Sequence, residues 1–325
     1  MARGELMKRL LASYGRDDEF RAVAEQIISE EEQKNNRVLA RSLRQTLEHA
    51  QGSAKIAKGL APLIPFPDAA NEYIERVNPV HSKRDVLLSP ANTNVFVRLI
   101  EEFRRSDDIR RHGLPVTSKL LFCGKPGTGK TVSAQAFAAE LALPLFSVKL
   151  DRLISSYLGE TASNIRKIFE FARKQPCVLL LDEFDALARS REDSSEHSEL
   201  RRVVNSLLMF IESLTPRGFL VAATNLDASL DLAIWRRFDE VVWFEYPNES
   251  MVRRFLKLKF RNMEAAFDPT AFAPQLQGYS YAEIERVAIQ AMKLAVIARR
   301  RIVAEEDFIL AIAEEARRKN GHERK

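Results

Sequence analysis

The stretch that decides how this chain folds is Gly124-Lys125-Pro126-Gly127-Thr128-Gly129-Lys130-Thr131. It fits the pattern Gly-x-x-x-x-Gly-Lys-(Ser/Thr) without a mismatch, follows an apolar run at 119–123 and leads into a helical run from Val132 onward. Glycines let such a loop fold round an anion with its backbone N–H groups facing inward, and the following helix N-terminus adds positive charge. We therefore expect these residues, together with Val132, to bind ATP, with Lys130 at the β- and γ-phosphates and the Thr131 hydroxyl on Mg²⁺.

Short apolar runs recur along the middle of the chain and alternate with helical segments. After a helical segment at 93–105 they lie at 119–123, 145–148, 177–181, 218–223 and 241–244. Continuous apolar strands between helices are typical of a parallel sheet covered on both faces. From Ser250 onward the strand pattern stops, and helices run to the C-terminus with a break at Gly278-Tyr279-Ser280. The sequence thus predicts an α/β P-loop NTPase fold with a five-stranded parallel sheet, a C-terminal helical lid domain and a small N-terminal helical region.

The N-terminal part of the chain has a different pattern. Apolar residues recur at helical spacing within 5–50, on both sides of a polar stretch at 30–36, which predicts two helices joined by a turn. The stretch 59–68 has three prolines and no periodicity, as in a linker. We therefore divide the chain into a helical hairpin for partner or substrate docking (1–58), a linker (59–84), a nucleotide-binding α/β domain (85–248) and a helical lid domain (249–325).

Composition argues against several other classes of protein. No apolar run approaches the roughly 18 residues that span a bilayer, and charged residues rather than an apolar core follow Met1. We therefore expect a cytoplasmic protein with no membrane partner. Cys123 and Cys177 lie inside strand-like runs, where buried thiols are favoured over a disulfide or a metal pair. The five histidines form no His-Glu-x-x-His pattern, so a fused zinc protease is not expected.

The chain is moderately basic. It carries 50 Lys and Arg against 45 Asp and Glu, a net charge of +5, and much of the basic charge comes as clustered arginines, as at 104–105, 110–111, 201–202 and 299–301. Such clusters serve as solvated helix faces, as contacts between subunits or as a track for nucleic acid. No aromatic-rich basic stripe or DNA-binding motif accompanies them. Nucleic acid is therefore the less favoured partner.

Polar residues at the ends of two apolar runs can supply the chemistry of hydrolysis. Asp182 and Glu183 follow the run 178–181, and Asn225 follows Ala222-Ala223-Thr224. Asp182 would hold the metal ion, through water, while Glu183 would polarise the attacking water. Asn225 would position that water beside the γ-phosphate. A lone Asn after a strand is more often a turn residue, so this last role needs support from a related family.

The chain resembles the AAA clade of the AAA+ ATPases over about residues 85 to 315. The stretches 158–161 and 164–169 are similar to the segment between that family's two nucleotide motifs, and Asn225 stands at its sensor-1 position. The stretch 230–239 matches its second region of homology, with a pair of arginines, Arg236 and Arg237, most like the spastin and katanin group. The stretch 278–284 is similar to the start of its sensor-2 helix.

The resemblance implies an active site shared between subunits. Arg236 and Arg237 would be arginine fingers that act on the ATP of a neighbouring subunit, in a ring that is a hexamer in this family. Tyr157-Leu158-Gly159 corresponds to the aromatic pore loop that grips an extended polypeptide in the central channel, although a packed tyrosine in a capping loop has the same pattern. A second pore loop would fall near 189–195.

Several positions depart from the family pattern. Lys125 stands where proline is usual, and the Pro-Gly before the arginine finger is absent, so the pattern does not decide between Arg236 and Arg237. Tyr281 replaces a common glycine at the lid helix. No arginine stands at the start of that helix, as in the AAA clade, and Arg286 is too far along it to be a sensor.

Two functions follow from the sequence. The favoured one is a Mg²⁺-dependent ATPase that forms a ring and remodels or unfolds a protein held by the pore and the N-terminal region. The alternative is an ATP-dependent regulatory switch that acts on DNA or on a partner enzyme. A subtilisin-like protease is one such enzyme, by analogy with small bacterial AAA ATPases of this build.

Overall fold

The computed structural model describes residues 73–77, 86–150, 152, 158–184, 198–225, 232–261 and 263–322. The chain divides into two compact units, Met1–Leu63 and Ile64–Lys325, and every described residue belongs to the second. The division falls inside the predicted linker, 59–84. The predicted N-terminal hairpin, 1–58, lies outside the described residues.

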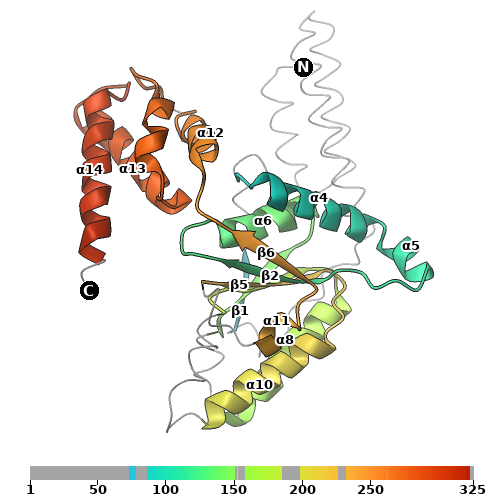
Figure 1. Ribbon diagram of the computed structural model, residues 1–325. Helices are drawn as coiled ribbons and strands as arrows, with labels where there is room; N and C mark the ends of the chain where they lie inside the picture. Colours follow the sequence, from blue (N-terminus) through green and yellow to red (C-terminus); the bar gives the residue numbers. More distant parts are fainter. Residues whose placement is uncertain are drawn as a thin grey trace, which may run out of the picture. The chain divides into compact units, whose positions relative to one another are not determined.

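The second unit is built on a six-stranded sheet with the strand order β1-β3-β4-β5-β2-β6 (Figure 1). Its five parallel strands are those predicted from the sequence: β2 (Lys119–Gly124), β3 (Leu145–Val148), β4 (Val178–Leu181), β5 (Phe219–Thr224) and β6 (Glu240–Phe244). The sixth, β1 (Ile74–Val77), pairs antiparallel with β3 at the edge. The predicted P-loop α/β fold is confirmed, with one strand more than expected.

β1 corrects the prediction of a linker throughout 59–84. It has only four residues, of which Glu75 and Arg76 are exposed, so it lacks the apolar run that marks the central strands. It is stabilised by its partner: Ile74 lies opposite Val148, and the Lys149 N–H donates to the Tyr73 carbonyl at 2.8 Å. A short edge strand of this kind depends on a ladder to a distant segment, which local sequence does not reveal.

Helices cover both faces of the sheet. α4 (Pro90–Arg104) and α6 (Lys130–Glu140) lie on one face, and α8 (Leu158–Lys174), α10 (Ser198–Ser213) and α11 (Leu232–Trp235) lie on the other (Figure 1). Every residue of β4 and β5 is buried, as expected for central parallel strands. A short helix, α5 (Ser106–Arg111), follows α4.

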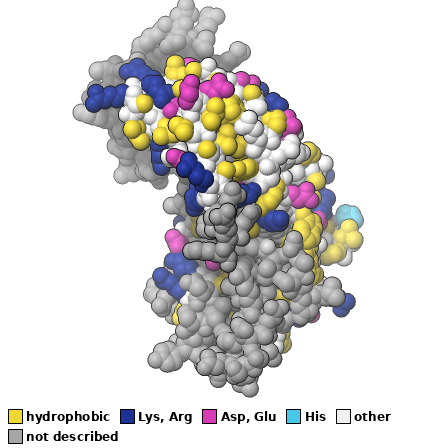
Figure 2. Space-filling view, turned by 60° about the vertical axis from the view of Figure 1, so that its left-hand side comes forward, with side chains coloured by type: hydrophobic (Ala, Val, Ile, Leu, Met, Phe, Trp, Pro, Cys, Tyr) yellow, Lys and Arg dark blue, Asp and Glu magenta, His cyan; other side chains and the backbone are white. Residues whose placement is uncertain are grey.

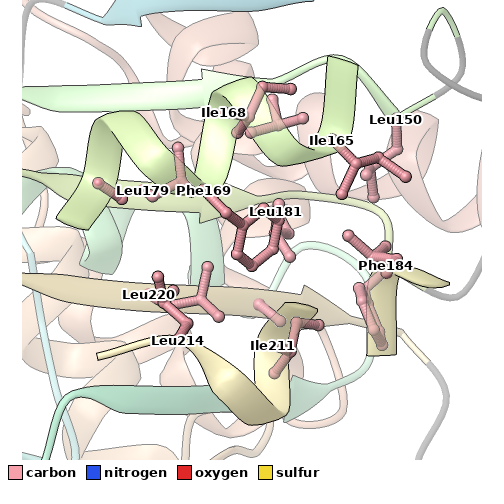
Figure 3. Packing of buried hydrophobic residues seen from close by; sticks show 14 of the residues in the cluster. Leu150, Ile165, Ile168, Phe169, Leu179, Leu181, Phe184, Ile211, Leu214 and Leu220 are labelled. Atoms are coloured by element: carbon pink, nitrogen blue, oxygen red, sulfur yellow. The ribbon is translucent and has the colours of Figure 1, made fainter. Parts of the chain in front are cut away.

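Each face of the sheet has its own apolar core. Between the sheet and α8 and α10, aliphatic side chains pack round Phe169 and Phe184 (Figure 3). On the opposite face phenylalanines meet, with Phe96 stacked 5.8 Å from Phe122 and Phe137 edge-on 4.9 Å from Phe219. Cys123 and Cys177 are buried free thiols, as predicted, and burial raises the pKa of Cys177 to about 12.

The C-terminal residues form a small helical lid. It comprises α12 (Glu249–Lys259), the 3₁₀ helix η2 (Pro269–Leu276), α13 (Tyr281–Ile297) and α14 (Glu305–His322), packed round Phe308. The predicted break at 278–280 is where α13 begins: the Ser280 hydroxyl accepts from the Glu283 N–H at 3.3 Å, and the Ser280 N–H donates to the Glu283 carboxylate at 2.5 Å. This reciprocal cap sets the start of α13 beside the phosphate loop.

Apolar side chains also gather on the exposed surface of the lid, seen in the upper part of Figure 2. Its exposed large apolar residues are Ile289, Val296, Ile297, Ile302, Ile309 and Leu310. Patches of this kind mark contacts with other proteins. Among the described residues no helix combines the length and apolar character needed to cross a membrane.

Candidate active site

The phosphate loop joins the end of β2 to the start of α6. Gly124 has φ +154°, and a Cβ there would lie 2.1 Å from the carbonyl oxygen of Phe244 on β6, so no larger residue fits. Gly127 has φ +75°, and a Cβ there would lie 2.7 Å from the Ser280 hydroxyl. The glycines therefore let the loop pass close both to the edge strand and to the lid.

Lys130 is the first residue of α6, yet its side chain is only 7% exposed. Its Nζ donates to three oxygens: the Gly124 carbonyl at 2.6 Å, the Lys125 carbonyl at 3.0 Å and Asn225 Oδ1 at 2.9 Å. A buried ammonium needs such partners because burial removes its water. The contact with Asn225 joins the phosphate loop to the end of β5, two segments 95 residues apart.

Thr131 and Asp182 also meet at this edge of the sheet. The Thr131 hydroxyl donates to Asp182 Oδ2 at 2.8 Å. Asp182 follows β4, Asn225 follows β5 and Gly124 ends β2, and these three strands are neighbours in the sheet. Since the carboxyl ends of parallel strands meet at one edge, the order of the strands brings the three predicted groups together.

Glu183 has a strained backbone, with φ +53°. Its N–H donates to Asp182 Oδ1 at 2.9 Å, while the next residue, Phe184, is buried and donates its N–H to the Ala223 carbonyl at 2.8 Å. The sharp turn leaves Glu183 exposed at the wall of the pocket. A left-handed conformation costs a residue other than glycine about 1 to 3 kcal/mol, and such strain gathers at functional sites.

This strain can be measured by comparing two variants that both lack the carboxylate. Glu183→Gly will be more stable than Glu183→Ala by about 1 kcal/mol, because glycine adopts a positive φ without the steric cost that alanine meets. Urea unfolding without nucleotide gives the difference. Equal midpoints for the two variants would show that the turn relaxes without strain.

A pocket of about 440 Å³ joins these groups. The phosphate loop, Asp182, Glu183 and Asn225 line one side, and the other side is lined by Val86, Leu87, Phe255, Lys259, Tyr281, Ala282 and Glu285. The Ala282 N–H donates to the Gly127 carbonyl at 3.2 Å, which links lid and loop. The volume of the pocket and its mixed apolar and polar lining suit a nucleotide.

The sequence did not reveal the second side of the pocket. Its residues come from separate segments, and no motif marks Val86, Leu87 or Lys259. Tyr281, noted only as a departure from a family glycine, packs edge-on against Phe255 with ring centroids 4.9 Å apart, and burial raises its pKa to about 12. Lys259 forms an ion pair with Glu285 in the same wall.

The arginine turn, Arg236–Arg237, lies away from this pocket. The neighbouring Asp239 donates its N–H to the Lys119 carbonyl at 2.8 Å and accepts from the Lys119 N–H at 2.9 Å, which places the turn at the beginning of β2. The phosphate loop starts at the other end of that strand, about 17 Å away at 3.3 Å per residue. Arg237 Nε lies 3.4 Å from Glu212 Oε2 of α10, whereas Arg236 is exposed.

The remaining predicted positions are only partly described. Tyr157 and the second pore loop, 189–195, lie outside the described residues, as do the first two residues of the second region of homology, 230–231. Leu158 and Gly159 begin α8. Arg286 binds Glu315 on α14, with 2.5 Å between Nη2 and Oε1, and is absent from the pocket lining.

The comparisons with known proteins agree with this geometry. Residues 120–246 match the family described as ATPase family associated with various cellular activities (AAA). The chain is 66% identical to the AAA family ATPase y4kL of Sinorhizobium fredii over 325 residues, which are 100% of this chain and 98% of that protein. The chain belongs to the AAA family of ATPases. The resemblance to that family, noted from its motifs, is therefore confirmed.

More distant relatives are larger proteins. The chain is 34% identical to the ATP-dependent zinc metalloprotease FtsH of Halothermothrix orenii over 223 residues, 66% of this chain and 35% of that protein. It is 34% identical to a katanin p60 ATPase-containing protein of Danio rerio over 195 residues, 56% of this chain and 40% of that protein. This AAA chain thus matches about a third to two fifths of the length of these two relatives.

Proposed function

We propose that this AAA ATPase forms a ring, a hexamer by family likeness, that uses ATP to remodel or unfold a protein. One observation carries the proposal. The groups that would bind and cleave ATP meet at the carboxyl edge of the sheet, whereas Arg236 and Arg237 lie at the opposite edge. The active site is then completed only by a second copy of the chain.

The phosphate loop, residues Gly124 to Val132, would hold the phosphates of ATP. The Lys130 ammonium now donates to the Gly124 and Lys125 carbonyl oxygens, and it would donate to phosphate oxygens instead when ATP binds. The hydroxyl of Thr131 and the carboxylate of Asp182, already in contact, are the hard oxygen donors that suit Mg²⁺, an ion that takes few protein ligands and completes its shell with water and phosphate. When bound, Mg²⁺ supplies positive charge to the phosphate oxygens.

Glu183 and Asn225 would act on the attacking water. Glu183 lines the pocket beside Asp182, and its carboxylate is exposed, so it can accept a proton from water. Asn225 Oδ1 lies 2.9 Å from Lys130 Nζ, and this contact supports a role for the amide beside the terminal phosphate. The amide would then orient the water rather than activate it.

Arg236 and Arg237 would stabilise the transition state on a neighbouring protomer. Within one chain they are separated from the phosphate loop by the length of β2, which no arginine side chain can span. A contact between two different surfaces of identical chains forms a ring when the repeated rotation returns to the first chain. The exposed apolar residues of the lid offer a further surface for such contacts.

A protein is the favoured partner. FtsH is by name a protease, and the arginine pair of this chain resembles that of the katanin group, so the likenesses point toward work on protein substrates. Tyr157-Leu158-Gly159 would contact the polypeptide in the channel, and residues 1–58 would dock it. The alternative remains an ATP-dependent switch acting on DNA or on a partner enzyme such as a subtilisin-like protease, which needs no pore aromatic.

Tyr157→Ala separates the two functions. If the protein threads its substrate, this variant will lose ATP-driven unfolding of a fluorescent protein bearing an unstructured tail, because the grip is lost while the nucleotide site is intact. Basal ATP hydrolysis will remain. Leu114→Ala, which removes an exposed apolar side chain outside both the proposed pore loop and the docking region, is the control. A chain that releases its partner with every ATP cycle, with or without Tyr157, would instead favour the switch.

A further inference from the structure

The two tryptophans of the chain, Trp235 and Trp243, lie against each other. Their ring centroids are 5.5 Å apart and the ring planes make an angle of 27°, which is a stacked pair. Trp235 is the last residue of α11, and Trp243 lies on β6. The pair therefore joins the short helix that precedes the arginine turn to the strand that follows it.

The position of Trp243 follows from strand alternation. Trp243 is opposite Cys123 in register, and Cys123 belongs to the core on the α8 and α10 face, so Trp243 also faces that side. Its neighbours Val242 and Phe244 are buried on the other face, but Trp243 is 47% exposed. A large aromatic ring is thus kept half in solvent, and it stacks on Trp235.

The arginine turn depends on the end of α11 for its position. The Arg237 N–H donates to the Ile234 carbonyl at 3.1 Å, and the Phe238 N–H donates to the Trp235 carbonyl at 3.3 Å. α11 has only four residues, too few for a helix to be stable by itself. Side-chain packing can supply its orientation, and two of its described side chains do pack: Ile234 is buried in the core and Trp235 is stacked on Trp243.

We propose that Trp235 and Trp243 are positioning residues for the arginine turn: their stack holds the end of α11 so that Arg236 and Arg237 reach the ATP of the neighbouring protomer. The inference rests on the proposed function of these arginines. Trp243 is the better residue to test, because it lies on a different element from α11 and its ring stacks on Trp235.

The first experiment compares full-length variants alone. Trp243→Ala is expected to lower the rate of ATP hydrolysis at saturating ATP by about 10- to 100-fold, the effect of displacing a catalytic group by about 1 Å. Trp243→Phe keeps an aromatic ring and is expected to stay within about threefold of the parent. Binding of a fluorescent ATP analogue should not change in either. Met209→Ala, which removes an exposed apolar side chain from α10, is the matched control.

The second experiment mixes inactive protomers. Lys130→Ala chains bind no nucleotide but keep their arginines, so adding them to Trp243→Ala chains should restore hydrolysis at the intact sites of the latter. Mixing Trp243→Ala with Arg236→Ala/Arg237→Ala chains should restore nothing, since every intact site then meets a defective arginine turn. This pattern cannot arise from a general loss of folding.

The mixtures distinguish a failure of the proposed tryptophan role from a failure of the arginine-finger role on which it rests. Recovery in a mixture of Lys130→Ala with Arg236→Ala/Arg237→Ala chains, without recovery in the Lys130→Ala and Trp243→Ala mixture, would overturn the role of the tryptophans alone. Parent-like hydrolysis by Trp243→Ala would overturn it as well. If the mixture of Lys130→Ala with Arg236→Ala/Arg237→Ala chains does not recover, the arginines do not act between protomers and the proposed function itself is wrong.

Discussion

Replacement of Arg236 and Arg237 together by alanine will lower ATP hydrolysis by about 10³-fold or more while ATP binding stays unchanged, if the pair acts on a neighbouring protomer. The phosphate loop lies at the far end of β2 from the turn, so no contact with the chain's own nucleotide is lost. The loss falls on the transition state, where negative charge on the transferred phosphate is no longer neutralised. The hydrolysis rate at saturating ATP measures the loss of turnover, and equilibrium binding of a fluorescent analogue measures the affinity for ATP.

The single variants will differ, since the two arginines have different surroundings. Arg237 lies 3.4 Å from Glu212 Oε2 and is partly buried, whereas Arg236 is exposed. We expect Arg236→Ala to affect hydrolysis without lowering stability, and Arg237→Ala to affect both. Arg110→Ala/Arg111→Ala removes another exposed pair, on α5, and serves as the control. Hydrolysis within a factor of about 2 of the parent in the double variant would exclude the finger role.

Glu183→Gln will retain ATP but lower its hydrolysis by about 10²- to 10⁴-fold, the range for loss of a general base. Glutamine has the shape of glutamate, so the strained turn and the contact between Thr131 and Asp182 should persist. ATP should therefore stay bound, and the ring should be longest-lived in this variant. Single-turnover hydrolysis and sedimentation with ATP measure the two effects.

Two further variants should differ from Glu183→Gln. Glu245→Gln neutralises an exposed carboxylate beyond β6 and should hydrolyse ATP like the parent. Lys130→Ala should fail earlier, at binding. Parent-like hydrolysis by Glu183→Gln would mean that another group activates the water. If Glu183→Gln retains ATP without hydrolysing it, its ATP-bound ring, with and without residues 1–60, is the form in which to capture the partner.

Much of the fold could be predicted because its signals are local. The five parallel strands are apolar runs that can be found one at a time, and the break before α13 follows from Gly278 and the Ser280 cap. β1 could not be predicted in the same way, because its four residues have no apolar run and depend on pairing with β3. Likewise, the pocket wall contributed by Val86, Leu87 and the lid combines segments that share no motif.

The sequence by itself determined the phosphate loop. Its glycines permit the backbone angles, and Lys130 and Thr131 stand at the helix start whatever else the chain does. Tertiary structure decided where the other groups lie. The order β4-β5-β2 brings Asp182 and Asn225 to that loop, because carboxyl ends of parallel strands share an edge, while Arg236 and Arg237 enter β6 at the opposite edge. The separation follows from strand length and direction, which a motif does not contain.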